Sequence, residues 1–215
     1  MKINGAIFDA DGTLFDSMHI WENLGESYIK SKGFEPGENF RDEVLGMSLK
    51  QSIKHILSKF SIDDTEENVL NDLIKLTEDS YHNAVKVKDG VPEFLEFLKS
   101  KNVKMCIATS AERKMVEGAL KNNNINEYFN FILTSTEVGI GKKSPTIYNL
   151  ALEKLNTDKN KTVVFEDAAH AAATAKKAGF NVCGIYDKFE KNQAELKENV
   201  ELYIISYNEA KKFFE

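Results

Sequence analysis

The stretch INGAIFDADGT, residues 3–13, decides which fold we expect for this chain. Its first six residues, 3–8, form a short apolar run of the length of a buried β-strand, and acidic residues follow without a spacer. Gly12 allows the chain to turn sharply directly after Asp9 and Asp11. Two carboxylates placed in this way after a strand suit hard-cation binding and paired nucleophile and acid/base roles.

Two other interpretations compete for this acidic turn. Carboxylates commonly cap helices and form turns, so Asp9 and Asp11 also fit an ordinary turn at a strand end. A calcium loop of the EF-hand type is excluded, because that loop needs glycine at its sixth position and Gly12 stands at the fourth. The turn by itself therefore leaves a structural and a catalytic interpretation open.

Short apolar runs alternate with helical patterns through the rest of the chain. Strands are expected at residues 103–108, 129–133, 162–165, 182–185 and 202–205, and helices at 91–101, 113–122, 146–155, 168–178 and 208–214. This alternation predicts an α/β fold, a Rossmann-like parallel sheet covered by helices on both faces in three layers. In such sheets ligands bind beyond the carboxyl ends of the strands.

Residues 17–85 differ from the rest of the chain in both charge and periodicity. They hold seven Lys and Arg against thirteen Asp and Glu, whereas the remaining residues are balanced. Apolar side chains recur there at helical spacing, as at Ile53 and Ile56. We therefore expect two domains, a core of residues 1–16 and 86–215 and an inserted, all-helical cap domain of residues 17–85.

Further strand ends deliver polar side chains to the same expected edge of the sheet. Thr109 and Ser110 follow the second run, where hydroxyls are also ordinary helix N-caps. Lys142 lies in the loop after the third run, where a solvated loop charge is the alternative. Glu166 and Asp167 end the fourth run. Acids, hydroxyls and a lysine gathered at one edge predict a pocket for Mg²⁺ and phosphate.

This ordered set of motifs resembles the haloacid dehalogenase superfamily, in its phosphatase and β-phosphoglucomutase-like branch with a helical cap. The likeness spans residues 3–185. The resemblance implies that Asp9 is the nucleophile and Asp11 the general acid/base. It also implies that the phosphoryl group is bound by Thr109, Ser110 and Lys142.

The same resemblance implies a Mg²⁺ cofactor. Its ligands would be Asp9, the backbone carbonyl of Asp11, and Asp167, with Glu166 as a further or water-mediated ligand. A carboxylate can attack phosphorus only where positive charge offsets the repulsion between two anions. Mg²⁺ and Lys142 would supply that charge.

Two departures from the family pattern bear on the expected function. Lys142 and Lys143 stand where members usually have Lys-Pro, so either lysine fits the pocket position. Leu49 and Trp21 stand where β-phosphoglucomutase-like members carry an Arg for a second phosphate and a His near the leaving group. We therefore expect hydrolysis of a small phosphate monoester, such as a sugar phosphate, through an aspartyl phosphate. A phosphomutase is the alternative, and a non-catalytic phosphometabolite-binding protein is a more distant one.

Charge and composition limit the partners and the location that we expect. The chain has 215 residues and a net charge of −6, which argues against nucleic acid and anionic membranes as partners. We find no signal peptide and no membrane-spanning apolar run, and Cys106 and Cys183 sit in apolar runs as core residues do. We expect a cytoplasmic enzyme that acts on a small phosphorylated metabolite, and the sequence indicates nothing about protein partners.

Overall fold

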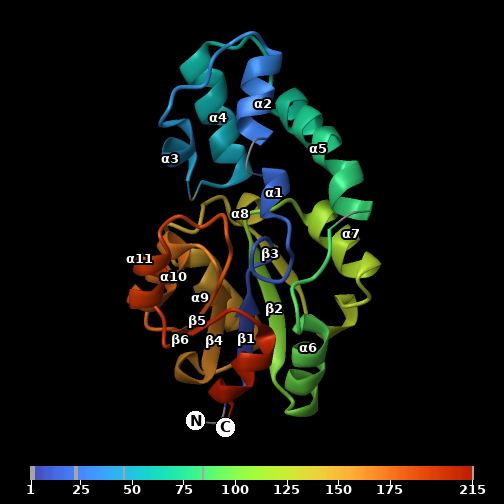
Figure 1. The fold of residues 1–215 in the computed structure, drawn as a ribbon, viewed down its shortest axis with the longest axis vertical. Helices are drawn as coiled ribbons and strands as arrows, with labels where there is room; N and C mark the ends of the chain where they lie inside the picture. Colours follow the sequence, from blue (N-terminus) through green and yellow to red (C-terminus); the bar gives the residue numbers. More distant parts are fainter. Residues whose placement is uncertain (1–2, 22–23, 46, 84, 215) are drawn as a thin grey trace.

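The computed structural model describes residues 3–21, 24–45, 47–83 and 85–214. A six-stranded parallel sheet forms the centre of the larger part, and a group of helices stands beyond one end of it (Figure 1). The strands are β1 (Gly5–Phe8), β2 (Lys104–Thr109), β3 (Ile132–Thr134), β4 (Thr162–Glu166), β5 (Asn181–Ile185) and β6 (Leu202–Ile204). The predicted α/β fold with a parallel sheet is confirmed.

The order of the strands places β1 at the point where the chain changes direction across the sheet. The order is β3-β2-β1-β4-β5-β6, so the chain first builds outward from β1 on one side and then on the other. Such a switch point opens a crevice beyond the carboxyl ends of the strands on either side of it. Asp9 follows β1 directly and therefore lies at this crevice.

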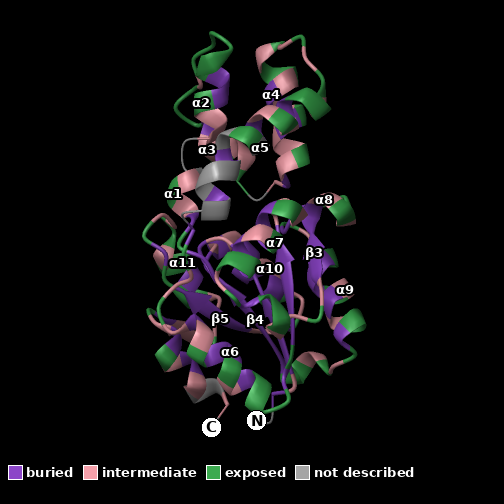
Figure 2. Ribbon diagram, turned by 90° about the vertical axis from the view of Figure 1, so that its right-hand side faces the viewer, coloured by how far each residue is buried: buried purple, intermediate pink, exposed green. Residues whose placement is uncertain are grey.

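Alternating side chains of the strands face two separate layers of helices. Ala6 and Phe8 pack into one apolar cluster, and Ile7 between them packs into the other. The first layer holds α6 (Val91–Ser100), α7 (Arg113–Asn122) and the 3₁₀-helix η3 (Tyr207–Phe213), and the second holds α9 (Thr146–Leu155), α10 (Ala169–Lys177) and α11 (Gln193–Glu198). The strands between them are buried along most of their length, as β4 and β5 show (Figure 2). The three-layer arrangement agrees with the prediction.

The segment before α6 forms a separate group of helices, which we call the cap helices. They are α1 (Met18–Trp21), α2 (Leu24–Ser31), α3 (Phe40–Val44), α4 (Leu49–Phe60) and α5 (Glu66–Asn83). Helices α2 to α5 share an apolar cluster that includes Tyr28, Phe40 and Ile53 and that is distinct from the two clusters of the sheet, whereas Ile20 of α1 packs against the first of those clusters. Ser48 begins α4 with a capping box to Gln51. The domain borders at residues 17 and 85 stay a prediction.

Some elements differ from those that the sequence predicted. Three short ones were missed, η1 (Asn126–Tyr128), α8 (Ser135–Val138) and η2 (Lys159–Lys161), because three or four residues are too few to show a period. The strand expected at 129–133 begins only at Ile132, after the η1 turn. The last predicted α-helix is a 3₁₀-helix, and α11 was not predicted. Among the described residues, no helix combines the length and the apolarity that a membrane crossing requires.

Candidate active site

Asp9 lies at the bottom of a pocket of about 420 Å³ between the sheet and the cap helices. Its backbone N–H donates to the carbonyl of Phe165 on β4 at 3.0 Å, which holds the residue at the strand end. The Lys142 ammonium donates to its Oδ1. Burial raises the pKa of Asp9 to about 6, although the positive charge of Lys142 acts against the shift. The carboxylate is therefore still mainly ionised at neutral pH.

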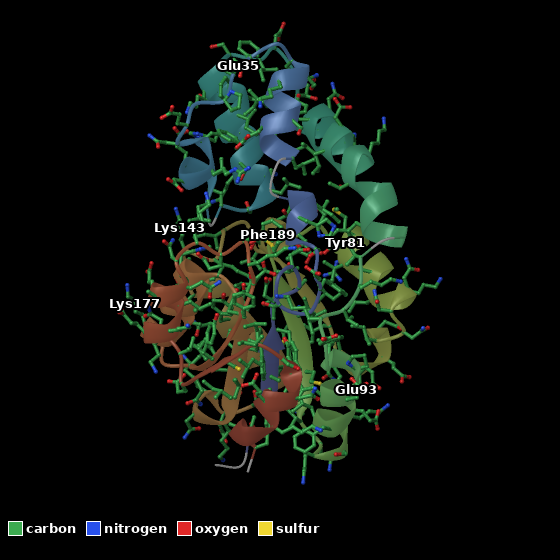
Figure 3. The ribbon with its side chains drawn as sticks, viewed as in Figure 1. Glu35, Tyr81, Glu93, Lys143, Lys177 and Phe189 are labelled. Carbon is green, nitrogen blue, oxygen red and sulfur yellow. The ribbon has the colours of Figure 1, made fainter. Side chains whose placement is uncertain are left out.

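The turn after β1 brings Asp11 and the cap helices together. Gly12 has φ of 73°, and a Cβ at this position would strike the Asp167 carboxylate, so the turn requires glycine. Oδ1 of Asp11 accepts hydrogen bonds from Ser17 and from the Tyr81 hydroxyl, the latter at 2.8 Å. Tyr81 lies on α5 at the junction of cap and sheet (Figure 3). Its burial raises the pKa of the phenol well above its usual value, so the hydroxyl remains a donor.

Lys142 is held between two carboxylates. Its Nζ contacts Asp9 and also donates to Oε1 of Glu166 at 2.6 Å, where the Tyr148 hydroxyl donates at 2.9 Å. Burial lowers the pKa of Lys142, but the charges of Asp9 and Glu166 outweigh burial and the net shift is upward. Lys143 is exposed at the outer edge of the molecule (Figure 3). The lysine that enters the pocket is therefore Lys142.

Three carboxylates form a group that could hold a metal ion. Oxygen atoms of Asp9, Glu166 and Asp167 lie within 4.8 Å of one another, and oxygen-only donor sets suit hard cations such as Mg²⁺. Burial raises the pKa of Asp167 well above its usual value and the two neighbouring acids add to the shift, while Thr13 donates to Oδ1 at 2.8 Å. A cation would offset this crowding of charge, so the residues fit the ion. Among the described residues, the Asp11 carboxylate is not part of the group.

Hydroxyl groups from the end of β2 line the same pocket. Thr109 is buried, and its hydroxyl accepts a hydrogen bond from the Ala111 N–H at 3.1 Å, which leaves the hydroxyl hydrogen to donate elsewhere. Ser110 also lines the pocket, with its Oγ 3.4 Å from Oγ of Ser135 on α8. Carboxylates, hydroxyls and a lysine that follow different strands thus meet in one pocket, as expected for strand ends at one edge of a parallel sheet.

Comparison with known proteins agrees with this arrangement. The sequence model for haloacid dehalogenase-like hydrolases matches residues 6–185, which is most of the chain. The chain belongs to the haloacid dehalogenase-like hydrolase family. The family resemblance predicted from the sequence is confirmed, and the protein is a hydrolase of this family.

Several known proteins are similar to this chain over most of its length. The phosphorylated carbohydrates phosphatase of Thermotoga maritima is 29% identical over 196 residues, which cover 91% of either chain. The (S)-2-haloacid dehalogenase 2 of a Pseudomonas species is 28% identical over 194 residues, 86% of this chain and 84% of that one. The crystal structure of CbbY from Rhodobacter sphaeroides in complex with phosphate superposes with a TM-score of 0.81 at 19% identity, covering 96% of each chain, and shows the shared fold.

Four side chains near the site were not predicted as functional residues from the sequence. Tyr81 and Tyr148 come from helix interiors, where a buried aromatic looks the same in sequence as a core residue. His170 and Phe189 line the pocket from α10 and from the loop after β5. Burial lowers the pKa of His170 to about 4, with Lys142 adding to the shift, so the imidazole is neutral at physiological pH. Among the described residues, the buried Nδ1 of His170 has no hydrogen-bond partner.

The pocket has two unlike sides. We call the four charged side chains at its bottom, Asp9, Lys142, Glu166 and Asp167, the floor. Opposite the floor lie half-buried or exposed apolar side chains from the cap helices and the segment after α3. We call them the apolar wall, and they are Leu24, Val44, Leu45, Met47 and Leu49. Leu49 and Trp21 are the two cap positions that depart from the β-phosphoglucomutase-like pattern, and the side chain of Trp21 lies outside the part that the structure describes.

Proposed function

We propose that this protein is a Mg²⁺-dependent phosphatase that releases phosphate from small phosphate monoesters through an aspartyl phosphate on Asp9. The observation that carries the proposal is the contact of Asp9 with Lys142 in a pocket where two more carboxylates gather. A relative 29% identical, named as a phosphorylated carbohydrates phosphatase, supports a phosphorylated substrate. A sugar phosphate is therefore among the substrates to test.

In this proposal Asp9 is the nucleophile. Its carboxylate oxygen attacks phosphorus, so an oxygen–phosphorus bond to Asp9 forms while the bond from phosphorus to the leaving oxygen breaks. Lys142, which already contacts Oδ1 of Asp9, reduces the repulsion between the carboxylate and the phosphoryl oxygens. The hydroxyl hydrogen of Thr109 is the donor for one phosphoryl oxygen.

Asp11 is the general acid in the first half-reaction and the general base in the second. As an acid it protonates the leaving oxygen, which departs as a neutral alcohol. As a carboxylate it takes a proton from the water that attacks the aspartyl phosphate, so phosphate leaves and Asp9 is restored. The hydrogen bonds from Ser17 and Tyr81 fix the orientation of the Asp11 carboxyl between these steps.

The residues that would hold Mg²⁺ are Asp9, Asp167 and the backbone carbonyl of Asp11, with Glu166 beside them. When bound, the ion supplies positive charge that stabilises the phosphoryl oxygens and the crowded carboxylates. Glu166 has a second task in this site, because it accepts hydrogen bonds from Lys142 and Tyr148 and so positions the lysine.

Two other activities, those of a phosphomutase and of a haloacid dehalogenase, are the alternatives to this proposal. A phosphomutase needs a second phosphate site, and Leu49 gives the cap side of the pocket an apolar side chain where the family resemblance puts an Arg. One relative is named a haloacid dehalogenase. The family resemblance associates carbon–halogen cleavage with a single Asp, whereas here Asp11 lines the same pocket as Asp9, which favours phosphoryl transfer.

The test combines phosphate release with detection of the covalent intermediate. With phenyl phosphate, we expect release by the wild type with Mg²⁺, loss of release with EDTA, and phosphate bound to protein after a rapid acid quench. Asp9→Asn should abolish both signals with an unchanged circular dichroism spectrum. Asp63→Asn, at an exposed cap position, is the matched control and should behave as the wild type.

Two outcomes would contradict the proposal. Wild-type-like release by Asp9→Asn would exclude Asp9 as the nucleophile. Transfer of the phosphoryl group to a hydroxyl of an added sugar phosphate, in place of its release as inorganic phosphate, would identify a phosphomutase.

A further inference from the structure

The apolar wall faces the floor across the pocket, where the leaving group of a bound phosphate ester would lie. Leu45 is 42% exposed, and Leu24, Val44, Met47 and Leu49 are half-buried, so their side chains are not sealed within the cap. The pocket volume of about 420 Å³ is in the range of small-molecule sites. When an apolar ligand group covers apolar surface that faces water, the free energy of the complex falls.

The sheet side of the pocket adds a further apolar surface. Phe189, in the loop after β5, is half-buried and lines the pocket at the junction with the cap helices (Figure 3). Besides the charged Glu26, Arg41 and Asp42, the cap side contributes one uncharged polar side chain among the described pocket residues, Ser52. A sugar hydroxyl that is buried against the apolar wall, away from these side chains and without a partner, costs about 1–3 kcal/mol. The surface around the leaving group therefore favours carbon over hydroxyl groups.

The charges around the pocket do not favour a second phosphate. Apart from the catalytic groups, the charged side chains that line it are Glu26, Asp42, Glu190, Arg41 and Lys191. Three acids and two bases leave no net positive charge among these described residues. Arg41 donates to Glu26 at 2.8 Å, so its charge is already balanced, and the neutral His170 adds none.

We infer that the natural substrate carries a single phosphoryl group on a largely apolar alcohol, whose carbon skeleton packs between the apolar wall and Phe189. This inference rests on the proposed function and narrows it away from free sugar phosphates and bisphosphates. The phosphoryl group would occupy the floor, and the alcohol would leave toward the cap helices.

The first test compares two esters of the same shape. Cyclohexylmethyl phosphate and glucose 6-phosphate both join a six-membered ring to phosphate through one CH₂–O group, and they differ in the polarity of the ring. We expect kcat/KM to be about 30-fold or more higher for cyclohexylmethyl phosphate, since one methylene in an apolar pocket already gives ~10-fold or more. Fructose 1,6-bisphosphate should be the poorest of the three.

The second test changes the wall itself. Leu45→Asn and Leu49→Asn should each lower the ratio of the two kcat/KM values about 10-fold, mainly through a higher KM for cyclohexylmethyl phosphate. Ile205→Asn is the matched control, because Ile205 is 70% exposed and lies outside the pocket, and it should leave the ratio unchanged. Circular dichroism confirms folding of each variant.

The outcomes separate the inference from the proposed function. Equal or better hydrolysis of glucose 6-phosphate, or of the bisphosphate, by the wild type would overturn the inference while hydrolysis of phenyl phosphate upheld the phosphatase. A wild type that releases no phosphate from any of these esters, phenyl phosphate included, would overturn the proposed function as well.

Discussion

Charged side chains are buried at the floor beside the sheet and partly exposed to water in the cap helices. In the floor, Asp9, Lys142, Glu166 and Asp167 are each at most 9% exposed, and Lys142 contacts Asp9 and Glu166 across 133 and 24 residues of sequence. In the cap helices, an ion pair such as that of Glu43 with Lys59 keeps about a third of each side chain in water, and the interior is apolar. A buried charge requires hydrogen-bond or ion-pair partners at fixed positions, which a rigid sheet can provide. An apolar wall requires only a surface that matches the shape of the ligand.

This difference predicts that substitutions in the floor change the rate of the chemical step and that substitutions in the wall change the choice of substrate. Variants in the floor should therefore mainly lower kcat, and variants in the wall should mainly change KM. The expected effects below run from the largest to the smallest.

Loss of the floor's cation should have the largest effect. We expect Lys142→Met to lower kcat/KM for phenyl phosphate about 10³-fold, because the charge that faces the phosphoryl group and the nucleophile is removed. The neighbouring Lys143→Met is the matched control and should stay near the wild-type value, since Lys143 is exposed. Phosphate release measures both. A comparable loss in Lys143→Met would show that the wrong lysine has been assigned.

Buried and half-exposed ion pairs should differ in their contribution to stability. Lys88 donates to Asp187 at 2.8 Å, with side chains 14% and 3% exposed, so Lys88→Ala leaves a buried carboxylate without its cation. We expect the free energy of unfolding to fall by about 3 kcal/mol. Lys59→Ala in the cap should stay within the error of the same urea titration. Equal losses in the two variants would remove the contrast between sheet and cap.

His170, which lines the pocket, should make stability depend on pH. Its pKa is about 4 in the folded protein and near 6.5 when unfolded, so the unfolded state takes up the proton first as pH falls. Stability is complete above about pH 6.5 and is lost progressively toward pH 4, by about 2–3 kcal/mol. Urea titrations of His170→Gln should lack this part of the loss.

The control for that experiment is His19→Gln on α1, where the side chain is exposed. This variant should retain the pH dependence of the wild type between pH 4 and 6.5. If His170→Gln lost stability with falling pH as steeply as the wild type, the neutral imidazole would not be its cause.

Tyr81 should have a smaller effect that depends on the leaving group. Tyr81→Phe removes the donor to Asp11, so we expect kcat/KM for cyclohexylmethyl phosphate, which covers the steps up to formation of the aspartyl phosphate, to fall about 10-fold. For p-nitrophenyl phosphate, whose leaving group departs without a proton, kcat/KM should stay near the wild-type value. Tyr186→Phe, at an exposed position, is the matched control. Equal losses with both esters would indicate a purely structural role for Tyr81.

Much of the fold and part of the site could be predicted from local sequence. The apolar run before Asp9 and the alternation of strands with helices carry enough information for a parallel sheet, because strand and helix periods are short-range properties. The polar residues at strand ends could be named for the same reason, since parallel strands bring their carboxyl ends to one edge. Short elements such as α8 were missed because their length hides any period.

Sequence by itself therefore determined the α/β class, the helical character of the cap segment and the strand-end residues that meet in one pocket. Only the tertiary structure decided that Lys142 and not Lys143 enters the pocket, that Tyr81 and Tyr148 donate to the site's carboxyl groups, and that an apolar wall faces the floor. The physical reason is distance: Lys142 and Asp9 are separated by 133 residues, and their contact depends on how loops and helices pack over the sheet, which no local pattern encodes.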